Sequence, residues 1–492
     1  MRYLPTGKFM QQADFNTINN IGIPSMVLME RAAIKTVEAM ENDNTDFSNT
    51  VVFCGSGNNG GDGFAVARLL DEKGYNVSVV FVGKESSLSD DCRIQRDIVI
   101  KKNIKVVTNI DDDNYTTVID AVFGVGLNRK IEGRYLDVIK KMNKMHGKKV
   151  AVDIPSGISS VDGSVLGDAF KANLTATFQC EKLGMVMFPG YTYIGKLVVC
   201  PIGIDTSIYD NEKEISFTYD KEDIINLMPK RKADSHKGSY GKVLMITGSK
   251  GMAGASYLSS YAAYKCGAGL VRIYTPEDNR TVLQTLLPEA IMTTYTDFEK
   301  EGLVEAINWA DTVCIGCGLG ISDLSDKILE TVIETVKVPL IIDADGINML
   351  RDKLDAVNKL DVPVIITPHM MEMSRLTCVS VSDIKKDRLN IIRDFTDKYN
   401  VICVLKDTRT VVTSKGMQYY INTSGNSSMA KGGSGDVLSG VISALIAQKG
   451  DPFKTACLGV YLHGCAGDEA AKLHGKYSVI ARELADSIET CI

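Results

Sequence analysis

The sequence from residue 49 to residue 74 reads NTVVFCGSGNNGGDGFAVARLLDEKG. Residues 49–54 are an apolar run typical of a buried β-strand, and residues 63–74 carry apolar side chains at helical spacing. The nine residues from 55 to 63 include five glycines and two asparagines. Glycine lets the backbone come close to a ligand, and the start of a helix offers free N–H groups to an anion. The stretch therefore predicts a strand, a phosphate-binding turn and a helix.

The alternation of strand and helix continues through both halves of the chain. Further strand-like runs lie at 75–82, 116–124, 148–157, 242–249, 311–316, 339–345, 362–368 and 400–406. A polar, charged stretch at about 205–235 separates two series of these runs. Strands separated by helices imply mostly parallel sheets that are covered by helices. We therefore predict an α/β fold with two three-layer domains, over residues 1–215 and 225–492.

The overall composition is that of an ordinary globular protein. Of the 492 residues, 45% are hydrophobic, and the net charge is −6. This charge argues against a sequence-independent nucleic-acid binder, which needs a basic face, and no run of about 18 apolar residues could span a membrane. The 12 scattered cysteines fit a reducing compartment. We expect a cytoplasmic homo-oligomer that binds neither nucleic acid nor membrane.

The glycine-rich turn has two other interpretations. Gly55, Gly57 and Gly60 match the G-x-G-x-x-G fingerprint of a dinucleotide-binding domain. Such a site needs an acidic residue about 20 positions further on, at the end of the second strand, and residues 81–83 read FVG instead. A tight turn without a ligand does not need so many glycines and asparagines. A phosphate site of another kind fits the residues better.

Two later strand-like runs carry aspartates. Asp120 comes shortly before a glycine-containing loop at 124–130, and Asp153 comes shortly before Ser156. The carboxyl ends of parallel strands meet at one edge of a sheet, where ligands bind. A carboxylate at that edge can transfer protons or hold a cation. Either aspartate could instead cap a helix or form a turn, but three loops that converge on one edge favour a ligand site.

The first half of the chain resembles the NAD(P)H-hydrate epimerase family. The runs GSGNNGGDGFAVAR (55–68), DAVFGVGLNR (120–129) and VDIPSG (152–157) are similar to the three signatures of that family. The resemblance implies a Rossmann-like domain that interconverts the R and S forms of hydrated NADH and NADPH.

The same resemblance assigns roles to individual residues. It implies that Asp153 is the acid/base group and that Asn59, Asp120 and Ser156 help to bind K⁺. The substrate-binding residues that it implies are Asn58, Asn59, Gly60, Gly61, Asp62, Gly124, Val125, Gly126, Leu127, Asn128, Arg129, Lys130 and Asp153.

A second glycine-rich helix start lies near the end of the chain. Residues 425–436 read GNSSMAKGGSGD, and an apolar helical run follows at 437–448. Uncovered N–H groups at 432–435 can stabilise a transferring phosphoryl group, and Asp436 can accept the proton of a substrate hydroxyl. Asp436 could instead only interact with the helix dipole, but that would leave the glycines unexplained. No G-x-x-x-x-G-K-[ST] sequence occurs, so the site is not a P-loop.

The second half resembles the ribokinase superfamily, and within it the ADP/ATP-dependent NAD(P)H-hydrate dehydratases. The similar runs are GGSGD (432–436), HKGSYG (236–241), GAG (267–269), GLG (318–320), DADGIN (343–348) and TPH (367–369). The resemblance implies a ribokinase-like domain that dehydrates the S hydrate with ADP or ATP and Mg²⁺. Asp436 would be its catalytic base.

Two sets of binding residues follow from this second resemblance. The substrate-binding residues would be Ala255, Gly320, His369 and Asp436. The nucleotide-binding residues would be Lys406, Asp407, Thr408, Arg409, Thr410, Asn426, Ser427, Ser428, Met429, Ala430, Lys431, Gly432, Gly433, Ser434 and Gly435. From the sequence alone, His369 fits a turn histidine as well as a ligand contact.

Several positions depart from the pattern of the dehydratase family. His369 is followed by Met370-Met371-Glu372 where Pro-Gly-Glu is usual, and Ser427-Ser428 replaces Pro-Gly. Lys431 and Ser434 stand where threonines are common. Ser434 keeps a hydroxyl group, whereas Lys431 adds a charge near the phosphates that bears on nucleotide choice.

Together the two halves predict a bifunctional enzyme that repairs NADH hydrate and NADPH hydrate, since the epimerase would supply the form that the dehydratase uses. Fused proteins of this kind resemble ADP users more than ATP users. A ribokinase-type kinase of a small alcohol or vitamin precursor is the alternative enzyme, but it leaves the first half without a role. A non-catalytic nucleotide-binding scaffold would not need both Asp153 and Asp436.

Overall fold

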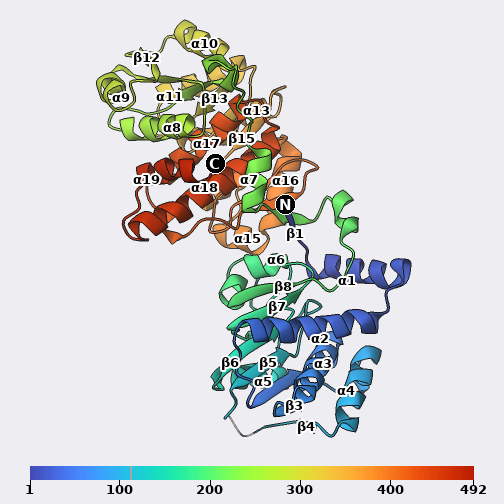
Figure 1. Ribbon diagram of the computed structural model, residues 1–492. Coiled ribbons are helices and arrows are strands. Elements are labelled where there is room, and N and C mark those ends of the chain that lie inside the picture. Colours follow the sequence, from blue (N-terminus) through green and yellow to red (C-terminus); the bar gives the residue numbers. More distant parts are fainter. Residues whose placement is uncertain (111–113) are drawn as a thin grey trace. The chain divides into compact units, whose positions relative to one another are not determined.

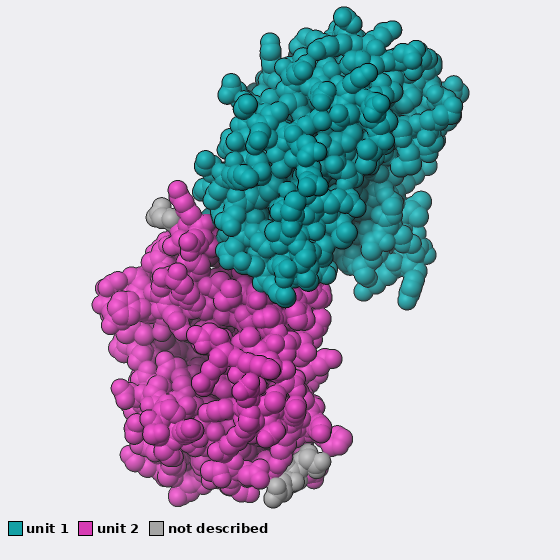
Figure 2. All heavy atoms as spheres, turned by 180° about the vertical axis from the view of Figure 1, so that it is seen from behind, with its two compact units in different colours: residues 1, 217–492 teal, residues 2–216 magenta. Residues whose placement is uncertain are grey.

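The computed structural model describes residues 1–110 and 114–492, which form two units (Figures 1 and 2). Unit 2 comprises Arg2–Ser216, and unit 1 comprises Phe217–Ile492 together with Met1. The division lies within the polar stretch at 205–235. Among the described residues, each helix is too short or too polar to cross a membrane.

Unit 2 is built on a parallel sheet with the strand order β4-β3-β2-β5-β6-β7-β8. Its strands are β2 (Thr50–Cys54), β3 (Val77–Phe81), β4 (Lys105–Val107), β5 (Thr117–Ala121), β6 (Lys148–Val152), β7 (Leu174–Phe178) and β8 (Lys196–Cys200). Its α-helices are α1 (Gly7–Phe15), α2 (Ser25–Asn42), α3 (Asn58–Glu72), α4 (Asp90–Lys101), α5 (Gly133–Lys144) and α6 (Leu183–Val186). The predicted strand, turn and helix at 49–74 are therefore β2, the loop after it, and α3.

Helices cover both faces of this sheet. Val52 of β2 belongs to a hydrophobic cluster with Phe64 of α3 and Val99 of α4. Its neighbour Val51 belongs to a second cluster with Met142 of α5. Successive side chains of a strand point to opposite faces, so β2 is buried on both sides. This explains why its sequence is a continuous apolar run, and it confirms the α/β prediction for this unit.

Two glycines of the turn allow close packing at the sheet edge. A Cβ atom on Gly63 would lie 2.4 Å from the Cβ atom of Ala121 in β5, and one on Gly55 would lie 2.1 Å from the carbonyl oxygen of Val122. Any side chain at these positions would push α3 or its loop away from β5. These glycines therefore serve the packing of α3 on the sheet.

Unit 1 contains a sheet in which nine strands follow the order β18-β17-β16-β15-β14-β13-β10-β11-β12 in the part of the chain that the structure describes. They are β10 (Lys242–Ile246), β11 (Leu270–Pro276), β12 (Ile291–Tyr295), β13 (Thr312–Ile315), β14 (Leu340–Ile342), β15 (Val364–Ile366), β16 (Ile402–Leu405), β17 (Val411–Thr413) and β18 (Tyr419–Ile421). In this spatial order, all neighbouring strands between β12 and β16 are parallel. The pairs β16–β17 and β17–β18 are antiparallel. The mostly parallel α/β architecture is as predicted.

Helices connect and cover the strands of unit 1 (Figure 1). They are α7 (Lys221–Leu227), α8 (Ala253–Lys265), α9 (Arg280–Leu286), α10 (Lys300–Trp309), α11 (Asp323–Thr335), α12 (Asp345–Leu350), α13 (Leu354–Val357), α14 (Met370–Thr377), α15 (Val381–Lys386), α16 (Arg388–Tyr399), α17 (Ser434–Ala447), α18 (Pro452–His474) and α19 (Ala481–Asp486). The predicted apolar helix after Asp436 is α17, which packs against α8 and α18. Because most of its residues are buried, α17 holds its first turn firmly in the unit.

Candidate active sites

Unit 2 contains a cavity of about 470 Å³ at the carboxyl ends of β2, β5 and β6. The predicted substrate-binding residues that line it are Asn58, Asn59, Asp62, Gly124, Val125, Gly126, Leu127, Asn128, Arg129 and Asp153. Residues of α1 and α2, such as Gln11 and Met29, form part of its wall. The three loops that the sequence placed at one sheet edge therefore meet around a single cavity large enough for a small ligand.

Asp153 follows β6 directly and has an unusual backbone conformation. Its φ angle is 66°, which lies in the left-handed region that most side chains avoid. Its N–H group donates a hydrogen bond of 2.8 Å to the carbonyl oxygen of Ala176 in β7. Strained backbone of this kind is found most often at functional sites, and here it belongs to a carboxyl group that lines the cavity.

The side chain of Asp153 forms a buried ion pair with Lys182. The Nζ atom of Lys182 lies 2.5 Å from Oδ1 of Asp153, and the Lys182 side chain is 1% exposed. Buried charges are stable only when they are paired and hydrogen-bonded. Lys182 therefore supplies a positive charge next to the predicted acid/base group, a feature that the sequence analysis missed.

Asp120 and Ser156 form a compact group of oxygen atoms that is not part of the cavity lining. Oδ2 of Asp120 accepts a hydrogen bond of 2.7 Å from the Ser156 N–H, and Oδ1 accepts one of 2.7 Å from the Ser156 hydroxyl. Burial raises the pKa of Asp120 to about 6, although the hydrogen bonds from Ser156 oppose this shift. The structure thus brings two of the three predicted K⁺ ligands into direct contact.

Asn59, the third predicted K⁺ ligand, has an unsatisfied side chain. Both its Oδ1 and Nδ2 atoms are buried, and neither has a hydrogen-bond partner among the described residues. A Cβ atom on Gly124 would lie 3.3 Å from Oδ1 of Asn59, so the glycine of that loop makes room for the amide. Leaving buried polar atoms unpaired costs free energy, which indicates that the amide interacts with a ligand or an ion.

Asp62 in the first turn of α3 also lines the cavity. Burial raises the pKa of its carboxyl group well above the ordinary value, and the negative charge of Asp153 raises it further. Asp62 therefore keeps its proton at a pH at which an exposed aspartate is ionised. The cavity is thus lined by a carboxyl group of raised pKa as well as by the ion-paired Asp153.

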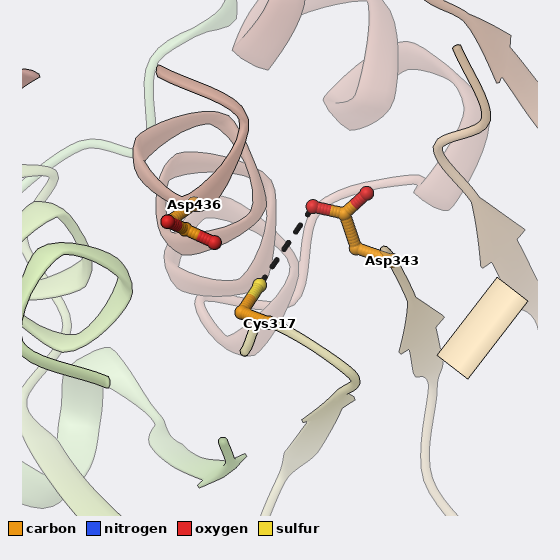
Figure 3. Close-up of side chains that lie close together, drawn as sticks. All are labelled: Cys317, Asp343 and Asp436. Atoms are coloured by element: carbon orange, nitrogen blue, oxygen red, sulfur yellow. Dashed lines mark hydrogen bonds between the residues drawn. The ribbon is translucent and has the colours of Figure 1, made fainter. Parts of the chain in front are cut away.

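The second candidate site lies at the start of α17 in unit 1. Asp436 is in the first turn of this helix, directly after the glycine-rich loop. One ligand-type atom each of Cys317, Asp343 and Asp436 lies within 4.8 Å of the others, and Figure 3 shows the three side chains beside one another. Burial raises the pKa of Asp436 to about 6, and the charge of Asp343 adds to this rise. Asp436 is therefore a stronger base than an exposed aspartate.

Asp343, at the end of β14, is held by several neighbours. Nζ of Lys406 lies 2.8 Å from its Oδ1 atom, and the hydroxyl of Ser439 donates a hydrogen bond of 2.7 Å to its Oδ2 atom. The thiol of Cys317 lies 3.7 Å from the same Oδ2 atom. Asp343 is thus a fixed anion that orders the first turns of α17 around it.

His369 caps the N-terminus of α14. Its Nδ1 atom accepts hydrogen bonds from the N–H groups of Met371 (3.1 Å) and Glu372 (3.2 Å), and Glu372 Oε2 accepts a 2.8 Å bond from the His369 N–H. The histidine thus has the capping role that a turn histidine would have, while its side chain stays 50% exposed. Met371 lies within regular helix, so the position that is glycine in the family needs no special backbone conformation here.

The predicted nucleotide-binding residues lie in two segments that meet at Lys406. A Cβ atom on Gly435 would lie 3.4 Å from Nζ of Lys406, which shows how closely the start of α17 approaches this lysine. Nearby, Oδ2 of Asp407 pairs with Nη2 of Arg388 at 2.5 Å, and Arg409 is buried. The side chains of Asp407 and Arg409 therefore stabilise their own segment, and Lys406 is the residue of this segment that approaches the glycine-rich loop.

The other segment, 425–435, is tied to the long helix α18. Nδ2 of Asn426 donates hydrogen bonds to the Gly467 carbonyl oxygen (3.0 Å) and to Oδ1 of Asp468 (2.8 Å). Nζ of Lys431 donates a bond of 3.0 Å to the carbonyl oxygen of Tyr477. The charge that Lys431 adds is therefore tethered at the edge of the loop and not at its centre.

Comparison with known proteins identifies the family of the chain. Residues 243–490 match the family model described as NAD(P)H-hydrate dehydratase, and residues 25–184 match that of the YjeF-related protein N-terminus. The bifunctional NAD(P)H-hydrate repair enzyme of Moorella thermoacetica is 35% identical over 98% of this chain and 95% of its own length, and that of Escherichia coli is 33% identical over 96% and 90%. The chain belongs to the family of bifunctional NAD(P)H-hydrate repair enzymes.

A solved structure is similar to the ribokinase-like part of this repair-enzyme chain. It is a ribokinase-like superfamily protein from Enterococcus faecalis, with a TM-score of 0.51 and 30% identity, and the match covers 56% of this chain and 94% of that protein. The family resemblance inferred from the motifs is thus confirmed for both halves of the chain.

Some predicted site residues of the repair enzyme lie away from its cavity lining. Gly60 and Gly61 are buried within the first turn of α3, where a Cβ atom on Gly60 would lie 2.1 Å from the Gly55 carbonyl oxygen. Lys130 is exposed and follows Arg129, which is the last residue of the 124–130 loop that lines the cavity. In unit 1, a Cβ atom on Gly318 would lie 2.7 Å from that of Ala255, next to Cys317.

Three residues beside the predicted acid/base groups were not assigned roles from the sequence. Lys182 pairs with Asp153, and Asp343 and Cys317 adjoin Asp436. Asp343 belongs to the DADGIN run, which could have pointed to it. Lys182 and Cys317 carry no comparable pattern, since a single lysine or cysteine is uninformative without the fold.

Proposed function

We propose that this chain repairs hydrated NADH and NADPH in two steps. Unit 2 interconverts the R and S hydrates, and unit 1 removes water from the S hydrate at the expense of ADP or ATP. The observation that carries the proposal is that one chain of this family places Asp153 in the lining of a cavity of about 470 Å³ and Asp436 at a glycine-rich helix start.

Epimerisation requires proton transfer without a change in oxidation state. In the hydrate, a hydroxyl group is bonded to the carbon next to the ring nitrogen. A proton delivered to this hydroxyl lets the nitrogen lone pair expel it as water, and water then adds to either face of the ring. Asp153 is the group that gives and takes this proton, a role that contributes typically 10²–10⁴-fold to a rate.

The residues Asn59, Asp120 and Ser156 suit a potassium ion. They offer amide, carboxylate and hydroxyl oxygen atoms, which are the donors that hard cations prefer. The amide of Asn59, which has no hydrogen-bond partner among the described residues, would find one in the ion. When bound, K⁺ would supply positive charge for a negatively charged dinucleotide at the edge of the cavity.

Dehydration begins with the hydroxyl group of the S hydrate. Asp436 takes the hydroxyl proton, and the oxygen attacks the terminal phosphorus of the nucleotide, so that the bond to the departing nucleotide breaks. The N–H groups at 432–435 stabilise the negative charge of the transferring group. Phosphate is then expelled by the ring nitrogen, and loss of a proton from the neighbouring carbon restores the dihydronicotinamide.

Magnesium enters this scheme with the nucleotide. Asp343 has partners in Lys406 and Ser439, and together with Cys317 and Asp436 it forms a group of ligand-type atoms that could hold an ion. Mg²⁺ keeps several waters and binds substrate phosphates with few protein ligands. It would neutralise charge on the phosphates, while the residues of unit 1 position the hydroxyl group.

The test follows the ultraviolet absorbance of the dihydronicotinamide. Purified protein with a mixture of R and S NADH hydrate should recover the absorbance band of NADH only when ADP or ATP is present, and the recovery should exceed the amount of S hydrate. The nucleotide that gives the faster recovery is the preferred donor. A stable phosphorylated product without recovery of the band would instead support the small-alcohol kinase.

A further inference from the structure

We propose that Lys182 is a positioning residue of the epimerisation site, which fixes the side chain of Asp153 in place and reserves one of its two carboxyl oxygen atoms for the substrate. The inference rests on the proposed epimerase function of unit 2. Lys182 itself acts through Asp153.

The ammonium group of Lys182 has no capacity left for other partners. Its Nζ atom donates to Oδ1 of Asp153 at 2.5 Å, to the Thr177 hydroxyl at 2.7 Å and to the Phe178 carbonyl oxygen at 2.8 Å. An ammonium group has three donors, so each of them is used. A charge as deeply buried as this one requires a negative partner, and Asp153 is the carboxylate that provides it.

The partners of Asp153 are distributed unequally over its two oxygen atoms. Within the described residues, its side-chain hydrogen bonds end on Oδ1, from Lys182, from the Phe178 N–H (3.2 Å) and from the Thr177 hydroxyl (3.4 Å). The Oδ2 atom is therefore the one available to a molecule in the cavity, which Asp153 lines. Since Thr177 and Phe178 belong to β7, the sheet fixes the carboxylate plane.

The charges around the cavity explain why a cation is needed at this point. Its ionisable lining residues are Asp14, Asp62, Asp91, Arg129, Asp153 and Lys182, and the thiols of Cys180 and Cys200 lie close enough to interact with Lys182. Negative charge at Asp153 is opposed by the other carboxyl groups in the same space. Lys182 is the cation that contacts Asp153 directly, so its removal should free the Asp153 side chain to turn and lose its alignment with a molecule in the cavity.

The experiment measures epimerisation alone, as the appearance of S hydrate from pure R hydrate without nucleotide. Lys182→Met should lower kcat by at least ~100-fold, the contribution expected of a general base, while KM changes less than threefold. The matched control is Lys196→Met in the same unit, whose side chain is 59% exposed, and it should keep the wild-type kcat. Equal kcat values for Lys182→Met and the wild type would overturn the inference.

A double-mutant cycle separates positioning from general stability. In the Asp153→Asn background, Lys182→Met should change kcat by less than about twofold, because a residue that acts through Asp153 has nothing left to position. Independent losses that multiply would overturn the inference. Asparagine tolerates the left-handed conformation of residue 153, so the background variant should fold.

Two further measurements keep the result interpretable. Dehydration of pure S hydrate with ADP or ATP by the same variants reports whether the chain is intact. If Lys182→Met does not fold, Lys182→Arg keeps the charge and should epimerise at least ~10-fold faster than Asp153→Asn, and equal rates would overturn the inference. A wild-type chain that does not epimerise at all would instead refute the proposed function.

Discussion

Lys406 forms an ion pair with Asp343, with 2.8 Å between Nζ and Oδ1, and this contact gives the two aspartates of the second site different properties. Burial favours the neutral form of Asp343, but the charge and hydrogen bond of Lys406, together with hydrogen bonding from neighbouring hydroxyl groups such as that of Ser439, outweigh it, so the pKa of Asp343 lies below its ordinary value. The pKa of Asp436 instead rises to about 6 through burial and the charge of Asp343. Neighbouring carboxyl groups with divergent pKa values typically divide acid/base roles. Under the proposed function, Asp343 is the fixed anion and Asp436 is the base.

The ion pair should matter for the stability of unit 1. Lys406→Met would leave the Asp343 side chain, which is 2% exposed, as an unpaired buried charge. Breaking a buried pair in this way should lower the free energy of unfolding by about 3–5 kcal/mol, as measured by urea denaturation. Lys250→Met is the control, because that lysine is 82% exposed and its loss should change stability by less than about 0.5 kcal/mol. Equal stabilities of the two variants would contradict the assignment.

The rate of dehydration should depend on the ionisation of Asp436. A base must be deprotonated to act, so kcat/KM for S hydrate should fall as the pH drops through about 6, the pKa of Asp436. An exposed aspartate would keep its activity down to a pH of about 4. The measurement is a pH–rate profile at constant nucleotide, with the pH-independent residual rate of Asp436→Asn as the control. A profile that stays flat between pH 5 and about 8 would exclude Asp436 as the base.

The raised pKa of Asp436 also predicts that its carboxyl group lowers the free energy of unfolding at neutral pH. Because the folded chain binds the Asp436 proton more tightly than the unfolded chain, the stabilisation present at low pH is lost as the pH rises to about 6. Asp436→Asn removes this cost and should raise the free energy of unfolding at neutral pH by about 1–3 kcal/mol. Asp234 is exposed, and Asp234→Asn should leave stability unchanged. If urea denaturation showed that Asp436→Asn is less stable than the wild type, this would argue against the raised pKa of Asp436.

Several parts of the fold and of the sites were predictable because local chemistry determines them. The strand, turn and helix at 49–74 correspond to β2 and α3, since buried parallel strands and helix starts have strong patterns. Asp120 and Asp153 were placed at one sheet edge because parallel strands bring their carboxyl ends together. Strand limits were less well predicted: the run at 339–345 gives only Leu340–Ile342 as β14, because Asp345 already begins α12.

Other parts depend on tertiary contacts that no local pattern reveals. Strand β7, next to the edge strand β8, reads LTATF, and its threonines gave no apolar run, although Thr175 and Thr177 are fully buried. Lys182 lies in a polar stretch, and only the packing of β7 against β6 brings it to Asp153. Cys317 is buried, and only the fold places it beside Asp436. The cytoplasmic location and the homo-oligomeric state stay predictions.

Epimerisation should depend on potassium. If Asn59, Asp120 and Ser156 hold K⁺, replacing K⁺ in the buffer by tetramethylammonium should slow the conversion of R to S hydrate severalfold, because the larger cation cannot enter a set of oxygen ligands. Asn59→Ala should abolish the response to K⁺ with little loss of stability, since the amide has no partner among the described residues. Dehydration of S hydrate is the internal control. An unchanged K⁺ response in Asn59→Ala would remove this residue from the site.

The most direct test of two cooperating sites is the extent of NADH recovery from a mixture of R and S hydrate by two single variants. Asp153→Asn should recover the S hydrate at the wild-type rate and then continue only as fast as R hydrate converts without catalysis. Asp436→Asn should recover almost none, although it still interconverts R and S. Complete and rapid recovery by Asp153→Asn, or undiminished recovery by Asp436→Asn, would contradict the division of the repair between these two aspartates.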